Sequence, residues 1–138
     1  MVLFYLTYHI DIHRINDIWR HEISACCLTE SKRKIILGDV SGAIGIYNLK
    51  SGERMKKTPY NNPFPVVALH YNDEKRHFLA GFANGLIMIF DDSGYVHCPK
   101  LFDFDISNGH NDLLHLTYNK NDSTVATLTN SSGVVKLW

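Results

Sequence analysis

Short apolar runs recur along the chain as pairs of strands joined by a tight turn. The first pair spans Lys34–Asn48, the second His77–Asp91 and the third Val125–Trp138. These runs are rich in β-branched and aromatic residues and are bounded by charged residues and glycine, which is typical of strands. Each turn ends in glycine, which adopts the positive φ of hairpin turns at little cost. The pattern therefore predicts three β-hairpins.

The three hairpins are copies of one repeating unit. The turn glycines lie 43 and then 48 residues apart, as do the aromatic residues that end each copy: Gly42, Gly85 and Gly133, and Tyr47, Phe90 and Trp138. An apolar segment precedes each hairpin, and a more polar one follows the first two. These segments are Ile23–Leu28, Val66–Tyr71 and Leu113–Tyr118 before the hairpins, and Glu53–Thr58 and Val96–Phe104 after them. The sequence predicts units of four antiparallel strands, with the third unit lacking its outer strand.

The second strand of each hairpin carries apolar residues on both of its faces. In the second copy, Leu86, Met88 and Phe90 point to one side, and Ile87 and Ile89 point to the other. A hairpin with one face in water would alternate polar and apolar residues. These strands must therefore be covered on both sides, and sheets stacked face to face around an axis provide that cover.

The third copy resembles one repeat of the WD-repeat family of β-propellers. The likeness runs from Gly109-His110 through LLHLTY and VATLT to VVKLW, and across all copies it covers roughly Arg20–Trp138. In the first two copies, Tyr47-Asn48 and Phe90-Asp91 stand where the family has Trp-Asp. The resemblance implies an all-β fold, a partial β-propeller of about three four-stranded antiparallel WD-type blades with the last incomplete.

The same resemblance implies a division of the chain into blades. Residues 1–19 are expected to form an N-terminal strand of a preceding or closing blade, with alternating apolar positions between Val2 and Ile12. Residues 20–62 and 63–108 are each expected to form a blade, and residues 109–138 an incomplete one. Family propellers commonly have seven blades of about 40–45 residues. Three blades leave open faces, so we expect contact with further propeller blades from the same or another chain.

A second likeness connects the chain with the WD-repeat proteins of ciliary and flagellar axonemes. It is carried by the segments RKIILGD, GxIxIYN, MKK and VVALHY in the first two units. What it implies is a place in a multi-subunit assembly of the cilium or flagellum axoneme, with tubulin or axonemal proteins as partners.

Composition excludes several classes of function. The chain has 14 Lys+Arg and 14 Asp+Glu and a net charge of +0, without the basic excess of nucleic-acid or membrane-surface binders. Its apolar runs are shorter than the ~18–20 residues of a membrane span. The apolar start lacks the basic region and cleavage site of a signal peptide. A cytoplasmic location follows, which agrees with reduced cysteines, and Cys26, aligned with the apolar Leu69, is expected to be buried.

Candidate chemistry is sparse. His9, Asp11 and His13 share one face of the first predicted strand, at spacings that a metal site could use, so a metal-binding or enzymatic module is the alternative function. The simpler interpretation is an exposed polar strand face. His110 is read either as a structural histidine, as the family implies, or as a catalytic group, which would need a placed nucleophile. Because GxSxG, HExxH and spaced CxxC pairs are missing from the sequence, we predict no catalytic residue, no metal and no cofactor.

The function predicted from these observations is a non-catalytic scaffold for protein–protein interaction. Loops between units and the glycine turns are expected to share one rim, with Phe64 between two prolines as the anchor. The candidate rim residues are Arg20, His21, Asn61, Asn62, Phe64, Asn84, Asn108 and His110. One basic cluster is a candidate docking patch for an acidic surface such as a tubulin tail. Its residues are Lys32, Arg33, Lys34, Arg54, Lys56 and Lys57.

Overall fold

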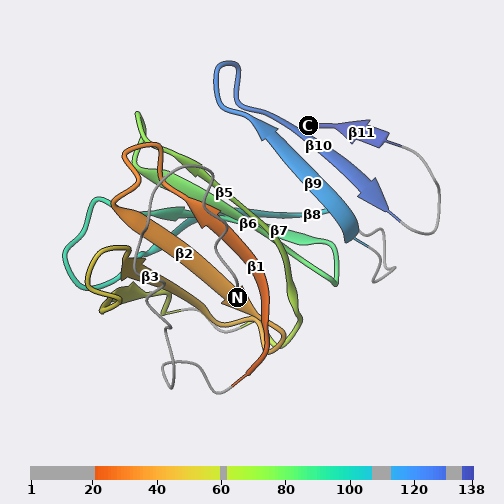
Figure 1. Cartoon of the computed structure of the whole chain (residues 1–138). Helices are drawn as coiled ribbons and strands as arrows, with labels where there is room; N and C mark the ends of the chain where they lie inside the picture. The colour runs from red at the N-terminus through yellow and green to blue at the C-terminus, as the bar shows by residue number, and fades with distance from the viewer. Residues whose placement is uncertain (1–20, 60–61, 107–112, 130–134) are drawn as a thin grey trace, which may run out of the picture.

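The computed structural model describes residues 21–59, 62–106, 113–129 and 135–138. Within these ranges the chain forms eleven β-strands and no helix (Figure 1). The strands are β1 (Ile23–Leu28), β2 (Lys34–Asp39), β3 (Ile44–Asn48), β4 (Arg54–Lys57), β5 (Val66–Asn72), β6 (His77–Phe82), β7 (Leu86–Asp91), β8 (Lys100–Asp105), β9 (Leu113–Asn119), β10 (Thr124–Thr129) and β11 (Val135–Leu137). In the part of the chain so described, no helical span crosses a membrane. The all-β expectation is confirmed.

The strands form three antiparallel sheets in chain order. The first two have four strands each, β1-β2-β3-β4 and β5-β6-β7-β8, and the third has the order β9-β10-β11. Every pairing joins strands that are neighbours in sequence. The innermost strand of each sheet carries an irregularity in register near its start, at Ser24, Val67 and Leu114. Three units of one design, the last without a fourth strand among the described residues, confirm the predicted architecture.

The outer strand of the second sheet differs from its prediction. It begins at Lys100, whereas the sequence pattern extended it back to Val96. The residues before it form a loop in which Cys98 is fully buried and His97 makes an isolated parallel bridge to Lys57 of the first sheet. The loop therefore packs against the neighbouring sheet, and Pro99, which has no amide hydrogen to donate, separates it from the strand.

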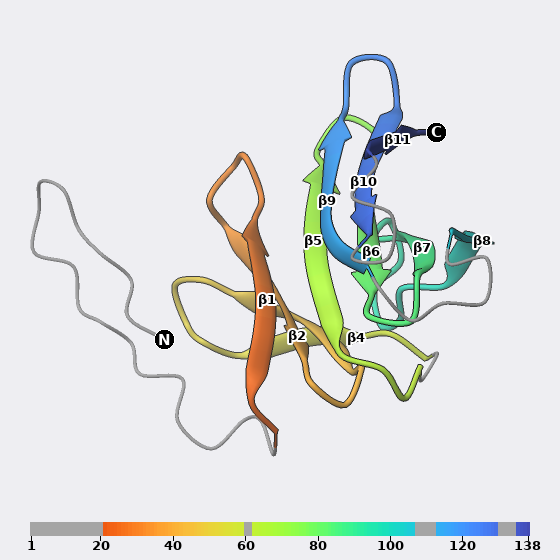
Figure 2. The ribbon, with the colours of Figure 1, turned by 90° about the vertical axis from the view of Figure 1, so that its right-hand side faces the viewer.

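The sheets are stacked so that β1 lies beside β5 and β5 beside β9 (Figure 2). A core between the first and second sheets contains Ile36, Ile46, Leu69 and Phe78, and its aromatic rings include the stacked pair Phe78–Phe90 at 5.0 Å. A second core lies between the second and third sheets. It contains Leu79, Ile87, Ile106, Leu113, Leu116 and Val125. The doubly apolar β7 supplies residues to both cores, as its pattern predicts.

Two glycines permit the close approach of successive sheets. A Cβ placed on Gly38 would lie 2.7 Å from the Cβ of Val66, and one on Gly81 would lie 2.8 Å from Cδ2 of Leu113. Val66 and Leu113 are the first residues of β5 and β9. Each glycine of a middle strand therefore makes room for the start of the next innermost strand.

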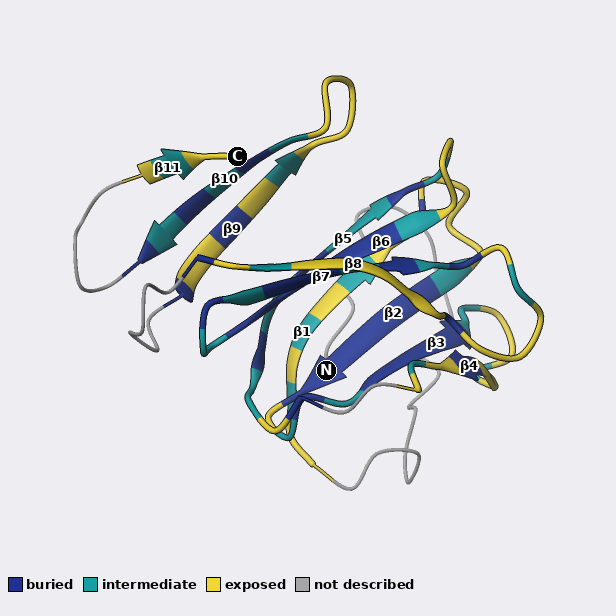
Figure 3. Cartoon of the chain, turned by 180° about the vertical axis from the view of Figure 1, so that it is seen from behind, coloured by how far each residue is buried: buried dark blue, intermediate teal, exposed yellow. Residues whose placement is uncertain are grey.

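Burial is uneven across the three sheets (Figure 3). Ile35, Leu37 and Tyr47 form a small buried cluster on the side of the first sheet that faces away from the second. Cys26, however, is exposed, although its repeat equivalent Leu69 is only 4% exposed. The expectation that Cys26 is buried is wrong. Leu69 faces the first sheet and is covered by it, and no described strand covers Cys26 in the same way.

Candidate interaction surfaces

The predicted basic cluster is divided by a buried carboxylate. Asp92, which follows β7 in the second sheet, is wholly buried and accepts hydrogen bonds from Lys34 Nζ at 2.6 Å and Lys56 Nζ at 2.5 Å. The Lys56 ammonium also donates to the Asp92 carbonyl oxygen at 2.7 Å. Lys34 and Lys56 extend from β2 and β4 of the first sheet, so the group joins two successive sheets. These two lysines are therefore directed at the protein interior.

Hydrogen bonding keeps the buried Asp92 ionised. Burial alone would raise the pKa of its carboxyl, but hydrogen bonds from Lys34, Lys56 and Tyr71 outweigh that effect and hold the pKa below its usual value. The Tyr71 hydroxyl donates to Asp92 Oδ2 at 2.7 Å, and burial with this bond raises the pKa of Tyr71. Burial also raises the pKa of the nearby Cys98 thiol to about 11. The cluster is a fixed ionic contact between sheets.

Sequence reasoning did not find Asp92 or Tyr71. Asp92 belongs to a different repeat unit from the lysines that it pairs with. The available signal was a pair of lysines, Lys34 on the apolar β2 and Lys56 on the more polar β4. Lysines that are buried at such positions are usually paired with a carboxylate.

The other four cations of the predicted patch lie in solvent. Lys32 and Arg33 belong to the loop between β1 and β2, and Arg54 and Lys57 lie on the edge strand β4; all four are exposed. The β1–β2 loop is linked to the β3–β4 loop by a hydrogen bond, in which the Leu49 amide donates to the Arg33 carbonyl oxygen at 2.9 Å.

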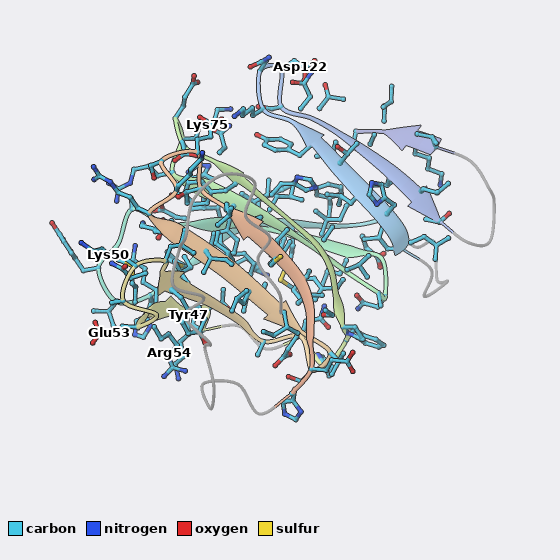
Figure 4. The ribbon with its side chains drawn as sticks, in the orientation of Figure 1. Tyr47, Lys50, Glu53, Arg54, Lys75 and Asp122 are labelled. Atoms are coloured by element: carbon cyan, nitrogen blue, oxygen red, sulfur yellow. The ribbon has the colours of Figure 1, made fainter. Side chains whose placement is uncertain are left out.

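Lys50 and Glu53 are exposed residues of the β3–β4 loop, and Figure 4 shows Glu53 next to Arg54, so one acid and one further cation belong to this region. Arg54 lies beside the hydroxyl of Tyr47. Burial raises the pKa of Tyr47 to about 12, against the lowering effect of Arg54.

The predicted rim is built from packed turns. A Cβ on Gly42 would lie 1.6 Å from the carbonyl oxygen of Asn62, so the first glycine turn rests on the segment that leads into the second sheet. Asn62 is 4% exposed, and its side-chain amide donates to Asn84 Oδ1 at 3.4 Å. Asn84 Oδ1 also accepts from the Leu86 amide at 3.3 Å. Asn62 and Asn84 are thus engaged with each other, and their contact fixes two turns of the rim.

The remaining rim candidates differ in burial or lie outside the described residues. Phe64 is half-buried and packs against the core between the first and second sheets, while His21 is exposed. Four further candidates lie outside the described residues: Arg20, Asn61, Asn108 and His110. Phe64, which was predicted to be the apolar anchor for a partner, therefore packs largely inside the protein.

Hairpin loops at the opposite side of the sheets contact one another across all three units. The Glu30 amide donates to Asp73 Oδ2 at 2.7 Å, and Lys75 Nζ donates to Ser123 Oγ at 2.9 Å. Lys120 forms an ion pair with Glu30, which links the first and third units. These contacts are exposed, and exposed ion pairs contribute about 0–1 kcal/mol to stability. The repeat alignment brings the loops to one side but does not identify their polar partners.

The metal hypothesis concerns residues that the structure does not describe. His9, Asp11 and His13 lie outside the described ranges. Within those ranges, no group of three His, Cys, Asp or Glu side chains is close enough to hold a metal ion.

The third unit ends in an aromatic contact. Trp138 Nε1 donates to Thr127 Oγ1 at 3.0 Å, and the Trp138 ring lies 5.9 Å from that of Phe104 on β8. Phe104 in turn lies 5.9 Å from Phe102, which is 58% exposed. The third sheet therefore contacts the second through an aromatic pair at Trp138 and Phe104.

Comparison with solved structures supports this architecture. The β-propeller domain of Cps50 (Swd1) from Myceliophteria thermophila superposes with a TM-score of 0.71 at 17% identity, covering 86% of this chain and 38% of that domain. The computationally designed protein Ika8 superposes with a TM-score of 0.65 at 21% identity, covering 85% of this chain and 33% of its own. The chain thus spans about a third of these neighbours.

Among curated proteins, Cilia- and flagella-associated protein 337 B of Tetrahymena thermophila is 29% identical over 82 residues. The match covers 59% of this chain and 6% of that protein. No protein-family profile matches the sequence. The fold of the chain is therefore that of a β-propeller segment with three consecutive blades, the third of which has three strands among the described residues.

Proposed function

We propose that this chain is part of a non-catalytic scaffold that binds an acidic protein surface through its first blade. The observation that carries the proposal is the division of the basic cluster. Asp92 engages Lys34 and Lys56 inside the protein, while Lys32 and Arg33 remain exposed. Arg54 and Lys57 extend the exposed surface along β4. With Lys50, this region has five exposed cations against two exposed acids, Glu30 and Glu53, which favours a partner rich in Asp and Glu.

The rim formed by the glycine turns is the second part of the proposed scaffold. Its turns are fixed by the Asn62–Asn84 contact, which supports a surface of defined shape. His21 is its exposed polar side chain among the described candidates. A rigid rim of this kind suits a folded partner, because little conformational entropy is lost when it binds.

The proposed setting is a multi-subunit assembly of the cilium or flagellum. Its support is the 29% identity over 82 residues to a cilia- and flagella-associated protein, of which this chain spans 6%. Within that setting, the acidic tails of tubulin are the partner class that the exposed cations would recognise. The location is cytoplasmic in this proposal.

Binding to a fluorescent poly-glutamate peptide tests the basic surface. We expect the full chain to bind, with an affinity that falls as salt rises, because the contact is electrostatic. The double variant Lys32→Glu/Arg33→Glu should weaken binding at least tenfold. Lys75→Glu/Lys100→Glu is the matched control, because it also reverses two exposed charges, both in the second blade, and should change the affinity less than twofold.

Equal loss of affinity in the control and in the double variant would contradict the proposed surface. Microtubules with and without their protease-removed acidic tails distinguish the tubulin partner from other acidic proteins. A chain that binds poly-glutamate but binds both kinds of microtubule equally would retain the basic surface and exclude tubulin tails. Fluorescence microscopy of the tagged chain in a ciliated cell tests the setting, and exclusion from the cilium would contradict it.

A further inference from the structure

Two large apolar side chains are exposed at the tip of the loop between β7 and β8. Tyr95 is 96% exposed, the largest fraction among the large apolar side chains of the described residues, and the adjacent Val96 is 65% exposed. Figure 3 shows the exposed stretch that leads into β8. A single exposed apolar residue is common on protein surfaces, but an aromatic residue beside a β-branched one forms a small apolar patch. The tip, which consists of Tyr95 and Val96, is therefore a candidate contact for a partner.

The loop that carries this tip is held at both ends. Its first residue, Asp92, is buried and bonded to two lysines of the first blade. Near its end, Cys98 is fully buried, and the Asp91 amide donates to the Pro99 carbonyl oxygen at 3.0 Å, which closes the loop. A loop that is fixed in this way loses little conformational entropy when its tip binds a partner. A tyrosine at such a tip adds a large contact area with few rotatable bonds.

The same loop runs beside the outer strand of the first blade. His97 forms a parallel bridge to Lys57, so the residues that precede each of them, Val96 in the loop and Met55 in β4, lie in the same direction from the bridge. Met55 is 42% exposed, and Lys57 belongs to the exposed cations of the basic surface. The apolar tip and the cations of β4 therefore adjoin. Together they form a mixed surface that consists of Arg54, Met55, Lys57, Tyr95 and Val96.

We propose that the mixed surface binds an extended protein segment in which acidic residues flank at least one aliphatic or aromatic residue. The carboxylates of that segment pair with Arg54 and Lys57, and its apolar side chain packs on Tyr95 and Val96. This inference rests on the proposed binding of an acidic protein and narrows the class of partner. A segment with acidic residues alone would leave the tip in water and would use only the charged part of the surface.

An anionic membrane would offer the same two kinds of contact. The observations favour a protein segment, because a tip of two residues provides little apolar area for insertion into a bilayer. The chain as a whole also lacks the excess of positive charge that attracts proteins to anionic lipids, since its net charge is +0. Binding to a membrane is therefore included as an outcome of the test.

Two fluorescent peptides of equal length and equal glutamate content test the mixed surface. One has two leucines at its centre, and the other has two serines there. We expect the full chain to bind the leucine peptide about tenfold more tightly, because its leucines are removed from water on the tip. In Tyr95→Ser/Val96→Ser this preference should fall below twofold, while the affinity for the serine peptide changes less than twofold. Tyr95→Phe should keep the preference.

The matched control is Val135→Ser/Leu137→Ser, which also removes two exposed apolar side chains, 62% and 72% exposed, from the third blade. It should keep the preference for the leucine peptide. Lys57→Glu should weaken the binding of both peptides by a similar factor, because it removes a cation and leaves the tip intact. Circular dichroism of each variant checks that the β-structure is retained.

The outcomes separate this inference from the proposed function on which it rests. If the serine peptide does not bind with a salt-dependent affinity, the basic surface and the mixed surface both fail. If it binds but leucine adds no affinity, only the mixed surface fails. Persistence of the preference in Tyr95→Ser/Val96→Ser, or its loss in the control, also overturns the inference. So does binding to vesicles of equal parts phosphatidylcholine and phosphatidylserine that depends on the tip and occurs without a preference for the leucine peptide.

Discussion

Lys56 in the outer strand of the first blade and Asp92 in the second are joined by a 2.5 Å ion pair, with 6% and 0% of their side chains exposed. Removing one partner of a buried pair leaves a desolvated charge without compensation. In this protein, removal of Asp92 would leave two lysine ammonium groups facing each other across a blade interface.

Asp92→Asn should therefore destabilise the protein strongly. We expect the free energy of unfolding to fall by about 3–5 kcal/mol, because Lys34 and Lys56 lose their counter-ion together. Urea denaturation followed by circular dichroism measures the change. Asp91→Asn is the matched control, since Asp91 bonds only the neighbouring Ser93 among the contacts identified for its side chain. A similar loss of unfolding free energy in both variants would show that the buried contacts of Asp92 stabilise the protein no more than the exposed contacts of Asp91.

Acidification should remove the stabilisation that the ionised Asp92 provides. The folded pKa of Asp92 lies below the value of about 3.9 for an exposed aspartate, so its stabilisation is complete above that value and is lost as pH falls through the lower folded pKa. The difference in unfolding free energy between the wild-type chain and Asp92→Asn should therefore be constant from pH 7 to 5 and shrink below pH 4. A difference that grows on acidification would reverse the sign of the expected linkage.

Gly38→Ala should destabilise the interface between the first and second blades. The added methyl would lie 2.7 Å from Val66 Cβ, and overpacking of this kind costs about 1–3 kcal/mol. Val66→Ala creates space at the same point, so the double variant should recover part of the loss. Thermal unfolding of the two single variants and the double variant gives the coupling energy. Strictly additive effects would mean that the two residues do not meet.

The three cysteines should differ in reactivity. Cys26 is exposed, whereas Cys98 is buried, and burial raises the pKa of Cys98 to about 11 and that of Cys27 to about 12. Because the thiolate is the reactive form, a thiol reagent at pH 8 should label Cys26 first. Mass spectrometry of the labelled peptides gives the order. Labelling of Cys98 at the rate of Cys26 in the native protein would show that the blade interface is open.

The sequence predicted the fold well because each blade repeats local signals. Turn glycines such as Gly42 and Gly85 adopt positive φ, and the doubly apolar β7 lies between two cores as its pattern requires. Contacts between blades were harder to predict. The Asp92 contact joins residues 36 and 58 positions apart in different units, and their identities do not repeat.

The burial of Cys26 was predicted wrongly for the same physical reason, because it depends on which sheet covers the residue and not on the residue's own strand. The candidate rim was predicted from turn chemistry alone. That chemistry identified Asn62 and Asn84 but not their contact with each other, which directs both side chains to the protein rather than to a partner. For Phe64, the flanking prolines gave no information about the core below it.

The open third blade gives the most direct test of the propeller-segment fold. Val135 and Leu137 are 62% and 72% exposed, and β11 is the last strand of its sheet among the described residues. An open edge with apolar side chains promotes association with other β-structure. Light scattering and thermal unfolding of residues 1–138 alone should therefore reveal oligomeric, insoluble or loosely folded material. A monodisperse monomer of 15.8 kDa with one cooperative transition would show that the three blades close by themselves and would contradict the fold as an open segment.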